Sequence, residues 1–520
     1  MKENLAKAVL IGMLLPAISL ADWKDDVGFT ALQARLGGAT PTGLGIDVTQ
    51  VEGPDANGYY MPNTANTQFT GKTINNVTGT SSGTSGHATI VGSYFYGLTM
   101  GLSPGIDPID VYEVNHWLGD GFLRSYTRFD PRTETRRIHN QSWVGAYPND
   151  AQSIDVLRRI DLVAERDGVL FVAAVENGAG TEIPKIPTSA YNNIAVGLSN
   201  GVSSYGPTLI EVAGRVKPDI VVPQPTTSHS KTSYVAPIVA GSASLLLQSA
   251  DADYAYLTNS QKVLLTKALL MAGATKLEFP DWRKGFSTPS TDGTVPLDYR
   301  YGAGQLNIDN SHRILTAGRQ EASGSSEVSV TGWDIGSASS TTVRQYYFDV
   351  PAPPASSVNS LSVIVTWYRK ITSSNGNPRV LTPSLANIDL HLYTADGFVR
   401  GDLRDQSVSA VDNVEHIYIY GLPAGRYVFE ITFNASWTYA VAWDLTQWPT
   451  VRPDLDGDGH VDADDLALFQ ACATAPGIPW TGNCAAADFD DDGDIDQDDF
   501  ALFQRCFSGP DVVADPHCYP

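Results

Sequence analysis

The chain has 520 residues, too many for one ordinary domain, and this length suggests about two to four domains. Apolar residues make up 42 % of the chain and charged residues 18 %, a balance that supports buried cores and argues against wholesale disorder. The formal net charge of −23 makes nucleic acid and anionic membranes poor partners for this protein.

The acidic residues are concentrated at the C-terminal end. Residues 451–520 hold sixteen Asp, no Glu, no Lys and two Arg, which gives this segment a formal charge of −14. The other 450 residues therefore carry −9 of the total. So compact a block of Asp either repels itself into disorder or binds cations.

The first 21 residues are typical of a signal peptide for export. Lys2 and Lys7 form a short basic region, residues 8–15 form an apolar run, and Ser19 and Ala21 offer small residues before a cleavage site. The apolar run is short for a membrane span, although an uncleaved anchor is the alternative. We therefore expect a secreted or cell-surface protein with no membrane span after the signal is removed.

Between residues 22 and 318, apolar runs typical of buried strands alternate with helical stretches. We expect strands at 44–48, 169–175, 193–197 and 219–222, and helices at 158–166, 235–249 and 260–273. Strands that alternate with helices predict an α/β domain whose parallel sheet is covered on both faces.

The pattern changes after a small, polar stretch at 318–330, which is typical of a linker. From 328 to 448, short alternating runs are separated by turn residues, which predicts an all-β sandwich. Asp389 and Asp412 are candidate calcium ligands in this region, although turn or surface roles suit them better.

The tail, residues 451–520, contains one internal repeat. The sequence DLDGDGHVDADDLALFQACA, which begins at Asp454, returns 34 positions later as DFDDDGDIDQDDFALFQRCF. Each copy has carboxylates at the ligand spacing of a calcium loop, a backbone carbonyl for position 7 and a glycine at the sharp turn of position 6. The ligand positions are Asp454, Asp456, Asp458, His460, Asp462 and Asp465 in the first loop, and Asp488, Asp490, Asp492, Asp494, Asp496 and Asp499 in the second.

Two details of these loops point to a family. Asp rather than Glu stands at position 12, and no clear helix precedes either loop, so residues 452–508 resemble the type I dockerin. The resemblance implies a small helical module with about two structural calcium ions. It also implies a cohesin partner, with attachment to the cell envelope as the alternative. We expect no organic cofactor.

All four cysteines lie in the tail. An even number in an exported chain suggests disulfides, and four cysteines allow three connectivities. The spacing favours Cys472–Cys484 and Cys506–Cys518, because both intervals are 12 residues and each pair closes one repeat. A zinc site is the alternative, but no CxxC pair or nearby His pattern supports it.

Four segments of the α/β region carry residue types that suit serine-peptidase chemistry. A serine hydroxyl needs a base to take its proton, the base is usually a His held by a buried carboxylate, and the oxyanion needs positioned donors. Taken singly, each candidate is more often a cap, turn or core residue. The candidates are Asp47 by a predicted strand, His87 before a small-residue helix, Asn177 after a buried strand and Ser233 at the start of an apolar helix.

The order Asp, His, Asn, Ser, separated by 40, 90 and 56 residues, makes residues 40–310 resemble the subtilisin-like serine peptidases. The resemblance implies that Ser233 is the nucleophile, His87 the general base and acid, and Asp47 the orienting carboxylate. It implies that Asn177 and the backbone N–H of Ser233 stabilise the oxyanion. The edge strand that pairs with an extended peptide substrate would be Ser142, Trp143, Val144 and Gly145.

Several positions depart from the family pattern. Lys231 stands where the family has Gly, Val235 replaces an Ala, and the segment at Asp47 reads DVTQ rather than DTG. Only about 25 residues separate the expected signal from Asp47, so we expect no folding prodomain of the usual size there.

The sequence therefore predicts a secreted serine endopeptidase with domains at 22–318, 328–448 and 451–520. One alternative is a catalytically impaired binding or cell-envelope protein on the same scaffold. Another is an esterase or peptide ligase that uses the same triad.

Overall fold

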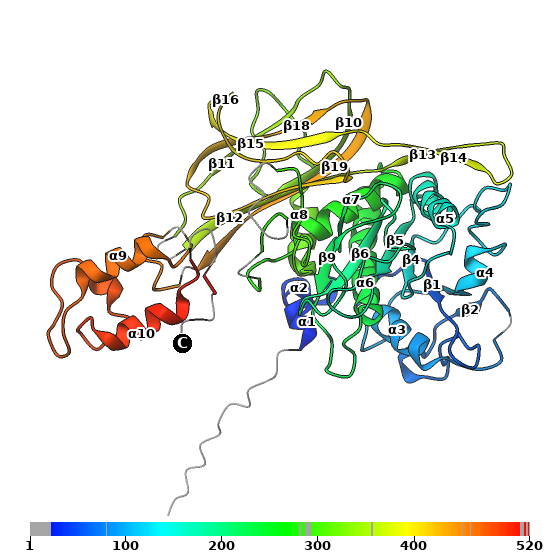
Figure 1. Ribbon diagram of the computed structural model, residues 1–520, viewed down its shortest axis with the longest axis horizontal. Coiled ribbons are helices and arrows are strands. Elements are labelled where there is room, and N and C mark those ends of the chain that lie inside the picture. The colour runs from blue at the N-terminus through cyan, green and yellow to red at the C-terminus, as the bar shows by residue number, and fades with distance from the viewer. Residues whose placement is uncertain are drawn as a thin grey trace, which may run out of the picture.

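The computed structural model describes residues 22–79, 81–279, 282–285, 293–354, 357–449, 451–457, 459–509, 514–515 and 518. The expected signal peptide, residues 1–21, lies outside the described residues. The described chain folds around an α/β core, a β-sandwich core and a small core in the tail (Figure 1).

A seven-stranded parallel sheet forms the centre of the α/β region, in the order β2-β3-β1-β4-β5-β6-β9. Every residue of β1, β4, β5 and β6 is buried, so both faces of the sheet are covered. The strands are β1 (Val48–Glu52), β2 (Ile74–Asn76), β3 (Ile109–Glu113), β4 (Ile138–Gln141), β5 (Leu170–Ala174), β6 (Asn193–Leu198) and β9 (Ile220–Val222); β7 (Gly206–Pro207) and β8 (Val216–Lys217) pair separately.

Eight helices are described in this region: α1 (Trp23–Asp26), α2 (Phe29–Leu36), α3 (Gly86–Tyr96), α4 (Val114–Leu118), α5 (Asp150–Val163), α6 (Thr232–Asp253), α7 (Asn259–Ala272) and α8 (Ile308–Ala317). Helix α6 packs against α3 and against β4, β5 and β6. By length and composition α6 could span a membrane, but 78 % of its apolar window is buried inside the protein, as expected of a core helix.

The second region is an antiparallel sandwich, with sheets in the orders β10-β19-β12-β17 and β11-β18-β15-β16. A hairpin, β13–β14, extends from it over the α/β region and packs on α5 (Figure 1). The strands are β10 (Gly332–Ala338), β11 (Arg344–Val350), β12 (Ser357–Trp367), β13 (Lys370–Ser374), β14 (Val380–Ser384), β15 (Ile388–Asp396), β16 (Val399–Ser407), β17 (Val414–Tyr420), β18 (Gly425–Phe433) and β19 (Trp437–Pro449).

The sandwich and the α/β region share apolar contacts. Trp333, Ile364 and Ala442 of the sheet β10-β19-β12-β17 belong to the same buried cluster as the α/β core. Helix α7 packs against α6 on one side and against β12 and β19 on the other. The sheet therefore buries one face against its partner sheet and the other against the α/β region.

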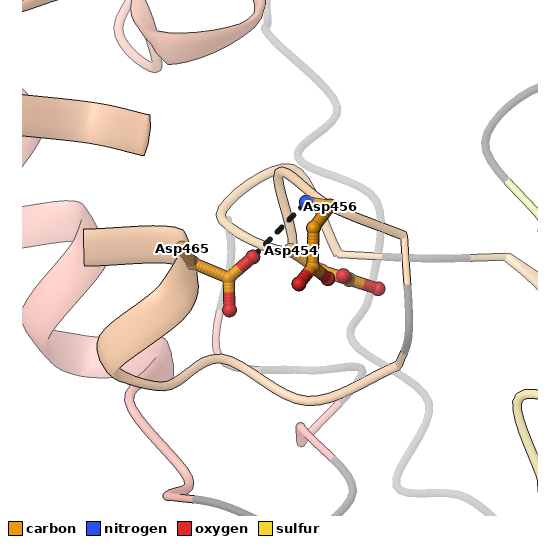
Figure 2. A group of neighbouring side chains, drawn as sticks. All are labelled: Asp454, Asp456 and Asp465. Carbon is orange, nitrogen blue, oxygen red and sulfur yellow. Dashed lines mark hydrogen bonds between the residues drawn. The ribbon is translucent and has the colours of Figure 1, made fainter. Parts of the chain in front are cut away.

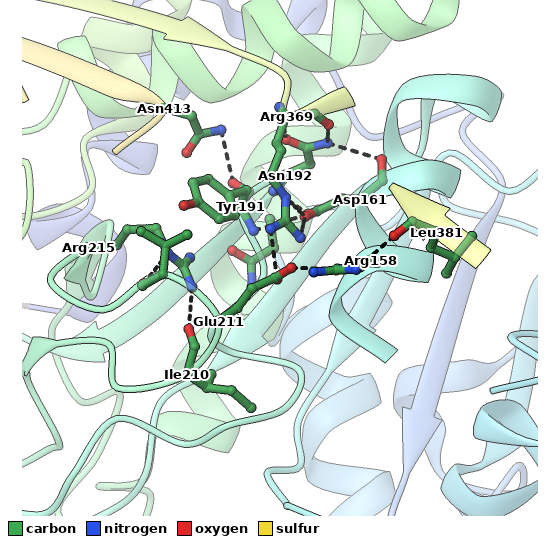
Figure 3. Close-up of polar contacts among 12 residues, drawn as sticks. Arg158, Asp161, Tyr191, Asn192, Ile210, Glu211, Arg215, Arg369, Leu381 and Asn413 are labelled. Carbon is green, nitrogen blue, oxygen red and sulfur yellow. Dashed lines mark hydrogen bonds and ion pairs between the residues drawn. The ribbon is translucent and has the colours of Figure 1, made fainter. Parts of the chain in front are cut away.

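Polar contacts cross the same boundary. Arg369, which follows β12, makes ion pairs with Asp161 on α5 at 2.6 Å and with Glu211 at 2.7 Å (Figure 3). Asp412 of the sandwich accepts a hydrogen bond from the backbone N–H of Val216 at 2.9 Å. This candidate calcium ligand therefore forms part of the contact between the sandwich and the α/β region.

The tail forms two helices, α9 (Ala463–Cys472) and α10 (Gln497–Cys506), each begun by an Asp capping box. The repeated Phe469 and Phe503 are buried in its core. The disulfides Cys472–Cys484 and Cys506–Cys518 are both present, which confirms the expected pairing.

Candidate active site and calcium loops

His87 lies in the first turn of α3, where it faces a buried carboxylate. Its Nδ1 atom is 2.8 Å from Oε2 of Glu52, the last residue of β1, whose side chain has no exposed surface. Burial disfavours the imidazolium, but the hydrogen bond and charge of Glu52 outweigh it, so the pKa of His87 is raised although Lys231 opposes the shift. The pair holds the ring with Nε2 on the side away from Glu52.

Gln50 fixes the second oxygen of Glu52. Its Nε2 atom donates to Glu52 Oε1 at 2.8 Å and to the carbonyl of Ala88 at 2.9 Å. Tyr96 in turn donates to Oε1 of Gln50 at 2.6 Å. Strand β1 and the start of α3 are therefore joined through one buried polar chain, which fixes the orientation of the carboxylate.

Asp47, the expected partner of His87, lies elsewhere. Its Oδ2 atom accepts a hydrogen bond from Arg136 at 2.7 Å, and Arg136 also bonds Asp110 at 2.8 Å. Asp47 precedes β1, whereas His87 contacts the carboxyl end of that strand. The structure thus corrects the assignment of Asp47, and Glu52 takes the position of the orienting carboxylate.

Asp47 was expected to contact His87 because the first strand was placed too early in the sequence. We expected it at 44–48, but residues 43–46 form a turn, in which Ile46 N–H bonds the carbonyl of Gly43 at 3.1 Å. The strand begins at Val48. The sequence holds one signal for the partner of His87: an acid followed by glycine, Glu52-Gly53, stands directly after the run VTQV.

Ser233 is the second residue of α6. Asn177 follows β5 and contacts Thr232, the first residue of the same helix. Oδ1 of Asn177 accepts from the backbone N–H of Thr232 at 3.0 Å and from its hydroxyl at 3.2 Å. Because Oδ1 is taken up by these donors, the NH₂ group of Asn177 is the part of the amide left to donate to an oxyanion.

The predicted substrate strand, residues 142–145, continues from the end of β4. Ser142 donates to the carbonyl of Ser233 at 2.8 Å, which ties this segment to the nucleophile's turn. Gly145 pairs with Ile186 through two backbone hydrogen bonds of 2.8 and 3.0 Å. Trp143 donates to Gln141 at 2.6 Å, and Trp143 and Val144 are half-buried.

His87 lies near the start of α6, because its ring centroid is 5.5 Å from that of Tyr234, the residue after Ser233. Ser233 is 7 % exposed, so its side chain is close to the surface but partly covered. Within the described part of the chain, no hydrogen bond joins the Ser233 hydroxyl to His87. Catalytic hydrogen bonds often tighten only when substrate binds, so this arrangement is compatible with an active site.

The first loop of the tail brings Asp454, Asp456 and Asp465 together, with one carboxylate oxygen of each lying within 4.8 Å of the others (Figure 2). Asp465 accepts from the backbone N–H groups of Leu455 and Asp456 at 2.7 and 3.1 Å, and this fixes the loop around it. Of the other predicted ligands, Asp462 caps α9, His460 is half-buried and Asp458 lies outside the described residues.

The second loop forms two such groups, Asp488 with Asp490 and Asp492, and Asp494 with Asp496 and Asp499. Oδ1 of Asp488 and Oδ1 of Asp494 are buried and have no hydrogen-bond donor among the described residues. Buried carboxylate oxygens without donors are costly unless a cation neutralises them. The second loop therefore fits a hard cation with oxygen ligands, such as calcium, and the carboxylate cluster of the first loop offers ligands of the same kind.

Comparisons with known proteins agree with this division of the chain. A model of the subtilase family matches residues 116–304, which include Asn177 and Ser233 but not His87 or Glu52. A model of the type I dockerin domain matches residues 452–507. No curated protein matches the chain.

Several solved structures share a limited likeness with the chain. A cold adapted subtilisin-like serine proteinase is 18 % identical, with 45 % of this chain and 83 % of that one covered and a TM-score of 0.31. Fervidolysin from Fervidobacterium pennivorans, a keratinolytic enzyme related to subtilisin, is 13 % identical over 78 % of this chain and 74 % of its own, with a TM-score of 0.35. MycP1 from Mycobacterium smegmatis is 16 % identical over 57 % and 86 %, with a TM-score of 0.32.

Proposed function

We propose that this chain, which carries a subtilase domain and a type I dockerin domain, is a secreted serine endopeptidase that cleaves peptides through an acyl-enzyme on Ser233. One observation carries the proposal. His87, held by the buried carboxylate of Glu52, has its ring 5.5 Å from that of Tyr234, the residue after Ser233, and Asn177 is bonded to Thr232, the residue before Ser233. These are the parts that acyl transfer needs.

The residues take the following roles. His87 accepts the proton of Ser233 as the hydroxyl attacks the scissile carbonyl carbon, and Glu52 stabilises the imidazolium that forms. The amide of Asn177 and the backbone N–H of Ser233 donate to the oxyanion. His87 then gives its proton to the leaving amine, and the C–N bond breaks. A water molecule, deprotonated by His87, hydrolyses the ester and frees Ser233.

The backbone of residues 142–144 would receive the substrate as an added strand, since both backbone groups of Gly145 are already bonded to Ile186. Its tie to the carbonyl of Ser233 places this segment beside the reacting serine. Backbone pairing suits an endopeptidase, because it recognises an extended chain with little regard to side chains.

The tail would hold calcium through Asp454, Asp456 and Asp465 in the first loop and through the carboxylates of the second loop. Calcium would neutralise their mutual repulsion and fix the two loops, which is a structural contribution. The folded tail would then dock on a cohesin or another cell-envelope partner outside the cell.

Labelling with a fluorophosphonate probe tests the peptidase proposal. We expect the purified protein to be labelled in calcium, and Ser233→Ala to be folded and unlabelled. Glu52→Gln should label far more slowly than the parent, while Asp47→Asn should label like it. If the folded parent is not labelled, the peptidase proposal fails.

The second candidate function is a binding protein on a peptidase scaffold. It is favoured by the absence, among the described residues, of a hydrogen bond between the Ser233 hydroxyl and His87. A folded, unlabelled parent that still binds unfolded peptides would support this second function.

A further inference from the structure

A proline inside helix α6 leaves one carbonyl at the start of the helix without its ordinary partner. Pro237 stands four residues after Ser233, and in an α-helix the N–H at that position donates to the carbonyl of Ser233. Proline has no N–H, so this helix bond is missing. Ser233 is buried, and a buried carbonyl without a donor is costly. The turn that presents the nucleophile therefore needs a donor from outside the helix.

Ser142 supplies that donor from the end of β4. Its hydroxyl donates to the carbonyl of Ser233 at 2.8 Å and accepts from Nδ2 of Asn140 at 2.9 Å. Asn140 has no exposed surface and Ser142 is 5 % exposed, so water competes little for these bonds. The bond from Asn140 occupies a lone pair of the hydroxyl oxygen, which leaves the hydroxyl hydrogen to point at Ser233.

Asn140 is an unfavourable residue for a buried strand. Its Oδ1 atom is buried and has no hydrogen-bond donor among the described residues. A half-satisfied amide destabilises a fold, whereas an apolar side chain at the same place would not. Within the described chain, Ser142 is the hydrogen-bond partner that the amide has. The support of Ser142, rather than packing, therefore accounts for an asparagine at this position.

The neighbouring strand carries a second polar chain of the same kind. Asn140 is paired with Gln50 in the register of β4 and β1, so the two side chains lie on the same face of the sheet. Gln50 bonds Glu52, which in turn holds His87. From two paired residues, one chain thus orients the candidate base and the other reaches the turn of the candidate nucleophile.

We propose that Asn140 and Ser142 are positioning residues for the nucleophile. The Ser142 hydroxyl replaces the helix hydrogen bond that Pro237 does not make, and Asn140 holds this hydroxyl in the orientation that the bond needs. Because Ser142 also begins the segment expected to pair with the substrate, the same contact joins substrate binding to the turn of Ser233. This inference rests on the proposed peptidase function.

The rate of Ser233 labelling by a small fluorophosphonate probe tests the proposal, because it does not depend on pairing with a peptide. We expect Ser142→Ala to lower the rate constant about 10- to 100-fold, since a small displacement of a reacting group has effects of that size. Ser142→Thr keeps the hydroxyl and should restore most of the rate. Asn140→Ala should lower the rate by a smaller factor, because the hydroxyl is still present but less well held.

A double-mutant cycle with Pro237→Ala makes the test specific. Alanine gives residue 237 an N–H that can donate to the carbonyl of Ser233. In that background, Ser142→Ala should lower the rate less than about threefold, because the carbonyl has a second donor. The matched control is Ser242→Ala, which removes a buried hydroxyl that donates to the carbonyl of Ile238 in the same helix at 3.0 Å. It should leave the labelling rate unchanged in both backgrounds.

Amide hydrogen exchange gives a second measurement that does not need activity, and thermal unfolding checks that every variant is folded. Exchange at residues 232–236 should be faster in Ser142→Ala than in the parent, but not in Ser242→Ala. If the parent is not labelled, the peptidase function fails, and exchange in this turn alone decides the role of Ser142. If Ser142→Ala matches the parent in labelling and exchange, or loses the same factor with and without Pro237, the positioning role is overturned while the peptidase function stands.

Discussion

Arg369 and Asp161, which are 208 residues apart in the chain, form a buried contact between the sandwich and the α/β domain. Nε of Arg369 donates to Oδ2 of Asp161 at 2.8 Å, and both side chains are almost fully buried. The guanidinium groups of Arg369 and Arg215 also lie 4.3 and 4.0 Å from the ring centroid of Tyr191 (Figure 3). The sandwich is thus joined to the domain that carries the active site by charges that water does not reach.

Arg369→Ala should destabilise the protein strongly. The change removes the ion-pair partner of the buried Asp161, while Glu211 keeps its pair with Arg158, and breaking such a buried pair costs about 3–5 kcal/mol. Chemical unfolding followed by tryptophan fluorescence measures the loss. Lys185→Ala is the control, because the Lys185–Asp150 pair is exposed and should contribute about 0–1 kcal/mol. Equal losses in the two variants would contradict the prediction.

Glu52→Gln should remove most of the catalytic activity without unfolding the protein. An amide can still contact His87, but it cannot stabilise the imidazolium, and the equivalent change in a serine-peptidase triad lowers kcat about 10⁴-fold. Asp47→Asn is the matched control and should change kcat less than about twofold, because the half-buried Asp47 pairs with Arg136 rather than with His87. Steady-state kinetics on one peptide decides between the two carboxylates.

The pH profile of kcat/KM should report the state of His87. The base must be neutral to accept the proton of Ser233, and its pKa is raised above the ordinary 6.5. Activity should therefore rise with pH, with a midpoint above 6.5. Lys231→Met should move this midpoint upward, because it removes a cation that opposes protonation. A midpoint that moves downward would show that Lys231 does not act on His87.

Local sequence patterns predicted the elements that depend on neighbouring residues. The apolar run at 169–175 became β5 (Leu170–Ala174), and the run at 235–249 lies inside α6. The duplicated loops predicted the tail as a separate structural unit, and the cysteine spacing predicted both disulfides, because each of these features repeats at a fixed interval.

Features that depend on contacts between distant segments could not be read in this way. Glu52 and Asp47 are both acids near one strand, and only the position of the strand end decides which faces His87. The pairing of Arg369 with Asp161 leaves no spacing signal, since it depends on how two domains pack. The sandwich was therefore predicted as a separate unit, whereas its sheet shares a core with the α/β domain.

Calcium removal should loosen the tail while the peptidase domain stays folded. Without cations the clustered carboxylates repel one another, and binding at about 100 times the dissociation constant stabilises a fold by about 2.7 kcal/mol. Calorimetry with and without EGTA should show one transition moving to lower temperature. Labelling of Ser233 should be unchanged, and reducing the disulfides should lower the transition further. An unchanged transition would contradict the assignment of the loops.

The two loop glycines give a test of how the tail meets the sandwich. Gly459 and Gly493 occupy the same loop position, with φ of +93° and +95°, so Ala strains the backbone equally at both. A Cβ at Gly459 would lie 2.1 Å from the ring of Tyr420 on β17, whereas a Cβ at Gly493 meets nothing within 4 Å. Both variants should weaken calcium binding, but Gly459→Ala alone should also displace the tail from the sandwich. Limited proteolysis in saturating calcium should then cut near residue 450 faster in Gly459→Ala than in Gly493→Ala. Equal rates would show that the contact with Tyr420 does not hold the tail in place.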